Sequence, residues 1–149
     1  MFRGNCPTRV DEKGRLKIPA DFKREFPEGQ KFYITSLDGK RAQLYPIAEW
    51  EEKEKALGKM PASHPARMKF LDVTSYYGQM AEMDGQGRLL LPHLLREEAK
   101  LTTDVVVIGK LGVIEPGLLE VVNHEMFKGQ IRAQPITKED LDALAGFGL

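Results

Sequence analysis

Residues 11–19 read DEKGRLKIP, and residues 84–92 return this stretch as DGQGRLLLP. Asp, Gly, Arg, Leu and Pro recur at the same internal spacing, with a constant offset of 73 residues between the two stretches. The match continues downstream, because Phe22-Lys23-Arg24-Glu25 aligns with Leu95-Arg96-Glu97-Glu98 at the same offset. The chain is therefore an internal duplication, and each half is one copy of a common structural unit.

Each copy predicts the same series of local structures. Apolar residues alternate after the Gly-Arg step, which indicates a short strand that leaves a tight turn. Pro19 and Pro92 end this strand and begin a short helix. A second pair of strands follows in each copy, at 31–35 and 42–45 around the turn dipeptide Asp38-Gly39, and at 105–108 and 112–115.

Helices are expected after and between the copies. Pro46 and Pro116 begin the next element of each copy, and apolar residues at helical spacing after Pro46 predict an amphipathic helix. A helix over 66–74 is expected to bridge the copies. A capping-box pattern at 137–140 and a stop at Gly146 predict a last, peripheral helix. The expected division is a first repeat, a helical linker, a second repeat and a C-terminal extension, at 1–57, 58–75, 76–124 and 125–149.

Composition limits the classes of function. The 149 residues are 42% hydrophobic, enough to bury a core, and the one cysteine, Cys6, permits neither an internal disulfide nor a cysteine metal cluster. His64, His93 and His124 are scattered without metal-ligand spacing. No apolar run has the length of a secretion signal or a membrane span, so we expect a cytoplasmic protein. We predict no catalytic residue, no metal site and no cofactor, and hence no enzyme.

Charge is distributed unevenly along a chain with zero formal net charge. Residues 1–75 hold 15 Lys+Arg against 11 Asp+Glu, whereas residues 76–149 hold 7 against 11. The excess of positive charge is already present in residues 1–24, with seven basic residues against three acidic ones. An anionic partner is expected to meet this face, although ordinary scatter of charge is the alternative explanation.

The repeated Asp-x-x-x-Arg pattern admits two interpretations. In the functional one, Gly14 and Gly87 form turns that project Arg15 and Arg88, each guanidinium being held by Asp11 or Asp84. A preorganised guanidinium suits phosphate oxygens or the O6/N7 edge of guanine, and the surrounding phosphate contacts would come from Lys13, Lys17 and Arg3. In the structural interpretation, each Asp and Arg close the turn as a partly buried pair and bind no ligand.

Four motifs in order resemble the MraZ family, the bacterial transcription regulators of the cell-division and cell-wall gene cluster. They are Met1-Phe2-Arg3-Gly4, the first Asp-x-x-x-Arg turn with its Pro19, Leu44-Tyr45-Pro46 followed by Glu49-Trp50, and Met83-Asp84 through Pro92. The likeness extends to about Glu125. This sequence departs from the family pattern at Gln86, which stands where the first copy has Lys13. The second turn therefore carries less positive charge, and we expect it to contribute less to DNA binding than the first.

The resemblance implies an α+β fold of tandem swapped-hairpin AbrB-like β-barrel units with short peripheral helices. It further implies ring homo-oligomers, octamers or dodecamers, that bind direct repeats in promoter DNA through the two Asp-x-x-x-Arg turns and associate with the nucleoid. The rival hypothesis is a structural or protein-interaction ring whose turns only hold their own shape.

Overall fold

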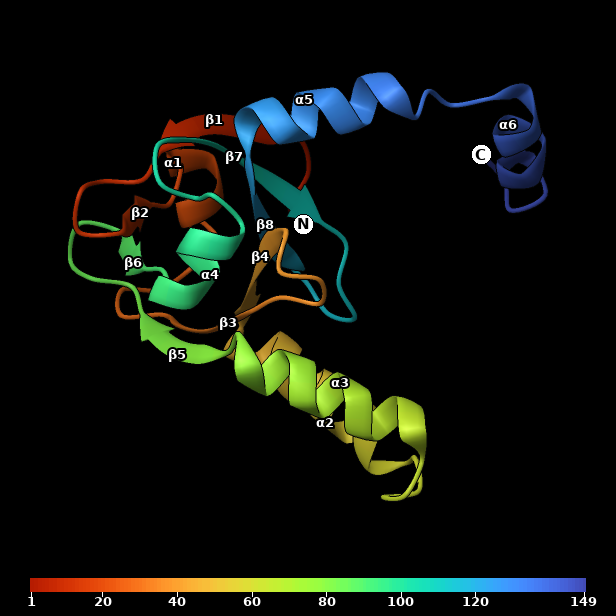
Figure 1. Cartoon of the computed structure of the whole chain (residues 1–149), viewed down its shortest axis with the longest axis horizontal. Coiled ribbons are helices and arrows are strands. Elements are labelled where there is room, and N and C mark those ends of the chain that lie inside the picture. Colours follow the sequence, from red (N-terminus) through yellow and green to blue (C-terminus); the bar gives the residue numbers. More distant parts are fainter.

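The computed structural model describes residues 1–149 as a mixed α+β fold (Figure 1), which confirms the predicted class. Its strands are β1 (Asn5–Arg9), β2 (Arg15–Lys17), β3 (Lys31–Thr35), β4 (Arg41–Pro46), β5 (Gln79–Glu82), β6 (Arg88–Leu90), β7 (Asp104–Lys110) and β8 (Leu118–Asn123). Its helices are α1 (Ala20–Lys23), α2 (Ile47–Gly58), α3 (Pro65–Tyr76), α4 (His93–Glu98), α5 (His124–Ala133) and α6 (Lys138–Ala145).

Two antiparallel sheets interleave the copies. The larger sheet has the order β1-β7-β8-β4-β3-β5, and the smaller one pairs β2 with β6. The first strand of each copy therefore pairs with a strand of the other copy, since β1 lies on β7 and β5 lies on β3. The large sheet is therefore symmetric in its strand order about the central β8–β4 pair: β7 and β1 follow β8 on one side, and β3 and β5 follow β4 on the other. The finer description, an AbrB-like swapped-hairpin barrel, stays a prediction.

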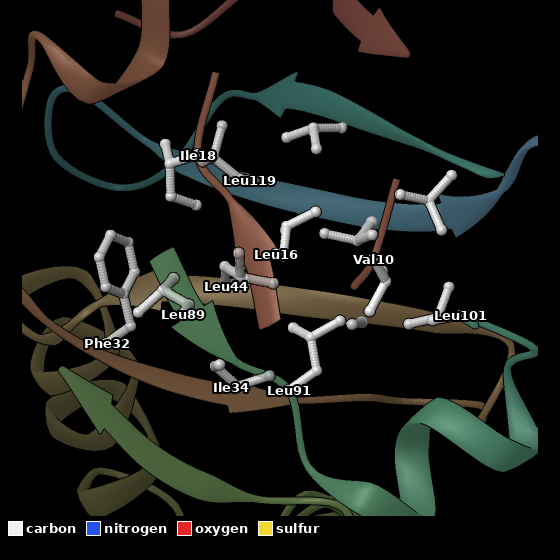
Figure 2. Close-up of a cluster of buried hydrophobic side chains, with 14 of the residues drawn as sticks. Val10, Leu16, Ile18, Phe32, Ile34, Leu44, Leu89, Leu91, Leu101 and Leu119 are labelled. Atoms are coloured by element: carbon white, nitrogen blue, oxygen red, sulfur yellow. The ribbon is translucent and has the colours of Figure 1, made fainter. Parts of the chain in front are cut away.

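One hydrophobic core serves both copies. Its main cluster of 19 buried residues draws side chains from each half, so neither copy has a core of its own. Leu16 and Leu89 lie opposite each other in the small sheet and are fully buried. Their side chains meet Ile34 and Leu44 of the large sheet (Figure 2). The strand alternation read from the sequence thus sets one face of β2 and β6 into the core.

Most of the predicted elements are present. Strands β3 and β4 form a hairpin around Gly39, whose φ of +72° suits the predicted turn. The bridging helix exists as α3. Helix α6 begins with the expected capping box, in which Thr137 and Asp140 each accept a hydrogen bond from the other's backbone N–H.

The strand predicted at 112–115 is wrong. These residues form part of a loop between β7 and β8, and Pro116 precedes strand β8 rather than a helix. The cause is a longer second copy: β7 has seven residues against five in β3, and its loop spans 111–117 against 36–40. The offset between corresponding residues of the two copies therefore rises from 73 before this loop to 77 after it, so that Arg41 at the start of β4 corresponds to Leu118 at the start of β8.

A buried carboxylate holds this longer loop in place. Glu49 of α2, 1% exposed, accepts the backbone N–H groups of Val113 and Ile114. In a strand, these two N–H groups would instead donate to carbonyl groups of a neighbouring strand. Leu111 and Val113 are left exposed on the loop surface.

Candidate nucleic-acid interface

The β2–β6 pair is a ribbon with two different faces. Its register places Arg15 opposite Leu90, Leu16 opposite Leu89 and Lys17 opposite Arg88. Because side chains alternate along a strand and cross-strand partners share a face, the two central leucines point inward. The outer face carries the remaining four side chains, which include three cations and no carboxylate: Arg15, Lys17, Arg88 and Leu90.

The first turn is closed by Asp11. Its Oδ1 accepts the backbone N–H groups of Lys13 and Arg15, each at 2.9 Å, and its Oδ2 accepts Arg15 Nε at 2.8 Å. Gly14, at φ +83°, donates its N–H to the Asp11 carbonyl at 3.0 Å. The Arg15 bond uses Nε, which leaves the two Nη groups of the guanidinium available to another acceptor.

The second turn repeats this geometry. Asp84 accepts from the backbone of Gln86 and Arg88 at 2.9 Å and from Arg88 Nε at 2.8 Å. In both turns the arginine backbone N–H is the main cause that lowers the pKa of the aspartate carboxyl below its ordinary value, with the guanidinium adding to it. Both aspartates are therefore ionised at neutral pH and hold their arginines by charge-assisted hydrogen bonds.

Each turn is covered by a basic residue of the other copy. The Arg96 guanidinium packs so closely on Gly14 that a Cβ there would overlap it, and the Lys23 stem packs in the same way on Gly87. Lys23 and Arg96 are themselves related by the 73-residue offset. Sequence reasoning did not assign these two to the site, although their alignment within the repeat was the available signal.

This exchange changes the expected balance between the turns. Lys17 and Lys23 of the first copy lie beside Arg88, whereas Arg15 has Leu90 and Arg96 of the second copy as neighbours. Basic residues of the first half are thus distributed over both turns. Lys13 adds a cation to the first turn, and Lys17 and Lys23 lie beside the second, so the weaker second turn expected from Gln86 stays a prediction.

The structure does not bring every predicted residue to the ribbon. Lys13 and Lys17 are exposed in and beside the first turn. Arg3 precedes β1, at the end of this strand that is farther from the first turn, and its backbone lies against Gly109 of β7. Five strand residues span about 17 Å, which separates Arg3 from the first turn along β1. Its neighbour Phe2 packs on Phe22, next to the Lys23 that covers Gly87 of the second turn.

Other kinds of site find little support in the geometry. No three His, Cys, Asp or Glu side chains gather as a metal site requires. None of the helices combines the length and the apolar character needed to cross a bilayer. The three histidines occupy the N-cap of α3 and the first residues of α4 and α5.

Comparison with known proteins decides the family. The family model described as "MraZ protein" matches residues 1–73 and 78–116. The chain belongs to the MraZ family. The transcriptional regulator MraZ of Acidobacterium capsulatum is 58% identical over 151 residues, and that of Koribacter versatilis is 50% identical over 152, each match covering the whole of both chains. The Escherichia coli K12 regulator is 31% identical over 144 residues, which cover 95% of this chain and 94% of the relative.

Membership in MraZ, a family of transcriptional regulators, confirms the resemblance read from the four motifs and the prediction that the chain is not an enzyme. The Asp-x-x-x-Arg turns lie within both matched segments, at 11–15 and 84–88.

Proposed function

We propose that the chain binds promoter DNA through the outer face of the β2–β6 ribbon. One observation carries this proposal: the outer face of the ribbon presents Arg15, Lys17 and Arg88, while its inner face is packed in the core. Asp11 and Asp84 hold the two arginines through Nε and leave their Nη groups free. A two-stranded ribbon fits the major groove of B-DNA. A rigid support keeps the donors in a fixed arrangement, which reduces the entropy lost on binding.

Each outer side chain has a role in this proposal. Arg15 and Arg88 offer their free Nη groups to guanine O6 and N7, and exposed Leu90 offers an apolar contact to a thymine methyl group. Phosphate contacts come from the flanking cations, with Arg3 a more distant one: Lys13, Lys17, Lys23, Arg96 and Arg3.

We further propose a closed homo-oligomer of AbrB-like units, an octamer or dodecamer, at the promoter of the cell-division and cell-wall gene cluster in the nucleoid. A single chain has zero net charge and presents one small ribbon. Specific DNA interfaces commonly bury about 1,000–2,500 Å² of protein surface, which favours several ribbons acting together. A ring places identical ribbons at regular intervals, and direct repeats in the DNA engage them with an avidity gain of about 10²–10⁴.

The rival function is a structural ring whose turns bind nothing. It is favoured by the three hydrogen bonds that each aspartate accepts, since these already account for the local pattern. It gives no reason for Lys17, the third cation beside the two paired arginines on the outer face of the ribbon.

A salt titration separates the two functions. Neutralised phosphates predict a linear fall of log K with log salt concentration, with a slope of about −0.9 per phosphate contacted. Lys17→Ala is expected to reduce this slope by about 1 for each ribbon engaged. Lys40→Ala is the matched control, because Lys40 is exposed on the β3–β4 loop, away from the ribbon. A slope near zero, or equal effects of the two variants, favours the structural ring.

A further inference from the structure

The backbone of the β2–β6 ribbon is nearly two-fold symmetric. Ile18 donates its N–H to the Gly87 carbonyl at 2.8 Å, and Leu91 donates its N–H to the Gly14 carbonyl at 3.0 Å. The two central leucines lie opposite each other and are both fully buried. A local two-fold axis therefore passes between these leucines and relates the two turns to each other.

The two arginines obey this symmetry. Arg15 and Arg88 donate from Nε to their aspartates at 2.8 Å in each case. Their side chains are exposed to a similar extent, 30% and 26%. Because the strands are antiparallel, the arginines lie at opposite ends of the outer face, two residues or about 7 Å apart along the ribbon. Two such donors alone would fit DNA equally well in either of two directions, related by a half-turn about the axis.

The residues beside the arginines break the symmetry. The 73-residue offset relates Lys17 to Leu90. The register places Leu90 opposite Arg15 and Lys17 opposite Arg88. One end of the outer face therefore combines a guanidinium with an apolar side chain, whereas the other end combines a guanidinium with an ammonium group. The two ends differ in the DNA groups that they can contact.

The apolar end can read one more base than the cationic end. Leu90 is 57% exposed, and thymine is the base that presents a methyl group in the major groove. A lysine, in contrast, contacts phosphates, which are the same in every sequence. The Leu90 end thus has contacts for a guanine and a neighbouring thymine, and the Lys17 end has contacts for a guanine and the backbone.

We propose that Leu90 and Lys17 fix the direction in which the ribbon reads DNA, with a thymine of each repeat at the Leu90 end. Direct repeats all run the same way, and identical ribbons around a closed ring also all face the same way. A fixed reading direction at each ribbon therefore suits such DNA. The inference rests on the proposed binding of promoter DNA by the ribbon and names the residues that select the orientation of the sequence.

Removing single thymine methyl groups tests the contact. In a DNA fragment from upstream of the gene, each thymine of one repeat is replaced in turn by deoxyuridine, which pairs in the same way but lacks the methyl group. Affinity is measured by fluorescence anisotropy. We expect one replacement to weaken binding of the wild type by about fourfold and to leave binding of Leu90→Ala unchanged.

Leu111→Ala is the matched control for this measurement. Leu111 is also an exposed leucine, but it lies in the β7–β8 loop, so its variant should keep the wild-type sensitivity to deoxyuridine. A wild type that tolerates every replacement, or a Leu90→Ala variant that still loses affinity at the same thymine, overturns the proposal.

An exchange of the two side chains tests the direction. An iron chelate on Gln86→Cys, in a Cys6→Ser background, cleaves the DNA near the second turn. With the natural ribbon, we expect cleavage on one side of each repeat. With Lys17→Leu and Leu90→Lys combined, the two ends trade their chemistry, and we expect cleavage on the other side. Both positions are exposed, and unchanged thermal melting verifies that the variant folds.

The matched control makes the same exchange outside the ribbon. Lys40→Leu combined with Leu111→Lys changes two exposed loop residues and should keep the wild-type side of cleavage. Cleavage on both sides with the natural ribbon, or an exchange variant that fails to bind or cleaves the wild-type side, overturns the proposal. The proposed function is judged separately, because it fails if Arg15→Ala keeps the wild-type affinity for the same DNA.

Discussion

Replacing Arg15 by alanine separates DNA recognition from the stability of the turn. Arg15→Ala removes the guanidinium but keeps the backbone N–H groups of residues 13 and 15, both of which donate to Asp11. The lost ion pair joins side chains that are 30% and 38% exposed. Ion pairs of this exposure contribute little to stability. We therefore expect the melting temperature to fall by less than about 4 °C.

The expected effect on DNA binding is much larger. A bidentate contact between arginine and a base is worth about 1–3 kcal/mol, or about 5- to 150-fold in affinity. In a ring every engaged subunit loses the same contact, so the loss multiplies with the number of ribbons on the DNA. Arg15→Lys should lie between wild type and alanine, because lysine keeps the charge but not the planar fork. Arg88→Ala is expected to cost less affinity than Arg15→Ala, since Gln86 stands in the second turn where the first has Lys13.

Affinity is measured by fluorescence anisotropy at one fixed salt concentration, beside thermal melting of the same samples. Arg132→Ala is the control, because Arg132 is an exposed residue of α5 at a distance from the ribbon. A fall of more than about 10 °C in melting temperature with unchanged affinity would refute the reasoning and assign Arg15 a structural role.

Three further outcomes are expected. Leu89→Ala empties a fully buried position of the shared core and should cost about 2–5 kcal/mol, lowering the melting temperature by about 4–20 °C. Glu49→Ala removes the acceptor for two loop amides, and hydrogen exchange should show faster exchange confined mainly to residues 111–117. Folding lowers the pKa of Asp84, so its stabilising effect is present above about pH 4 and is lost as the pH falls further. The melting temperature of Asp84→Asn should therefore be lower than that of the wild type at pH 7, and the two melting temperatures should converge near pH 2.

The repeat made the local structure predictable. The hydrogen bond between Asp and Arg, the turn glycine and the alternating apolar residues are all decided within nine residues, and the sequence contains this pattern twice. The helix at 66–74 and the capping box at Thr137 were also predictable, because each is decided by residues a few positions apart in the sequence. Local chemistry of this kind does not depend on how the copies are assembled.

Features decided across the copies were not predictable. The residues at 112–115 include the β-branched pair Val113-Ile114 and align with a strand of the first copy, but Glu49, a carboxylate 64 positions before Val113, accepts two of their N–H groups. Lys23 and Arg96 reach the opposite turn because β2 of one copy pairs with β6 of the other, which places each turn glycine beside the start of the other copy's short helix. For the same reason the excess of positive charge in the first half did not indicate which turn is the more basic.

Dimethyl sulfate footprinting on the DNA upstream of the gene tests the central claim most directly, because this reagent methylates guanine N7 in the major groove. The ribbon model predicts protected guanines recurring with the direct repeats, with protection lost in the Arg15→Ala and Arg88→Ala double variant and kept in Arg132→Ala. Bound DNA whose guanine N7 atoms all stay reactive, or protection that survives the double variant, would contradict recognition by the β2–β6 ribbon.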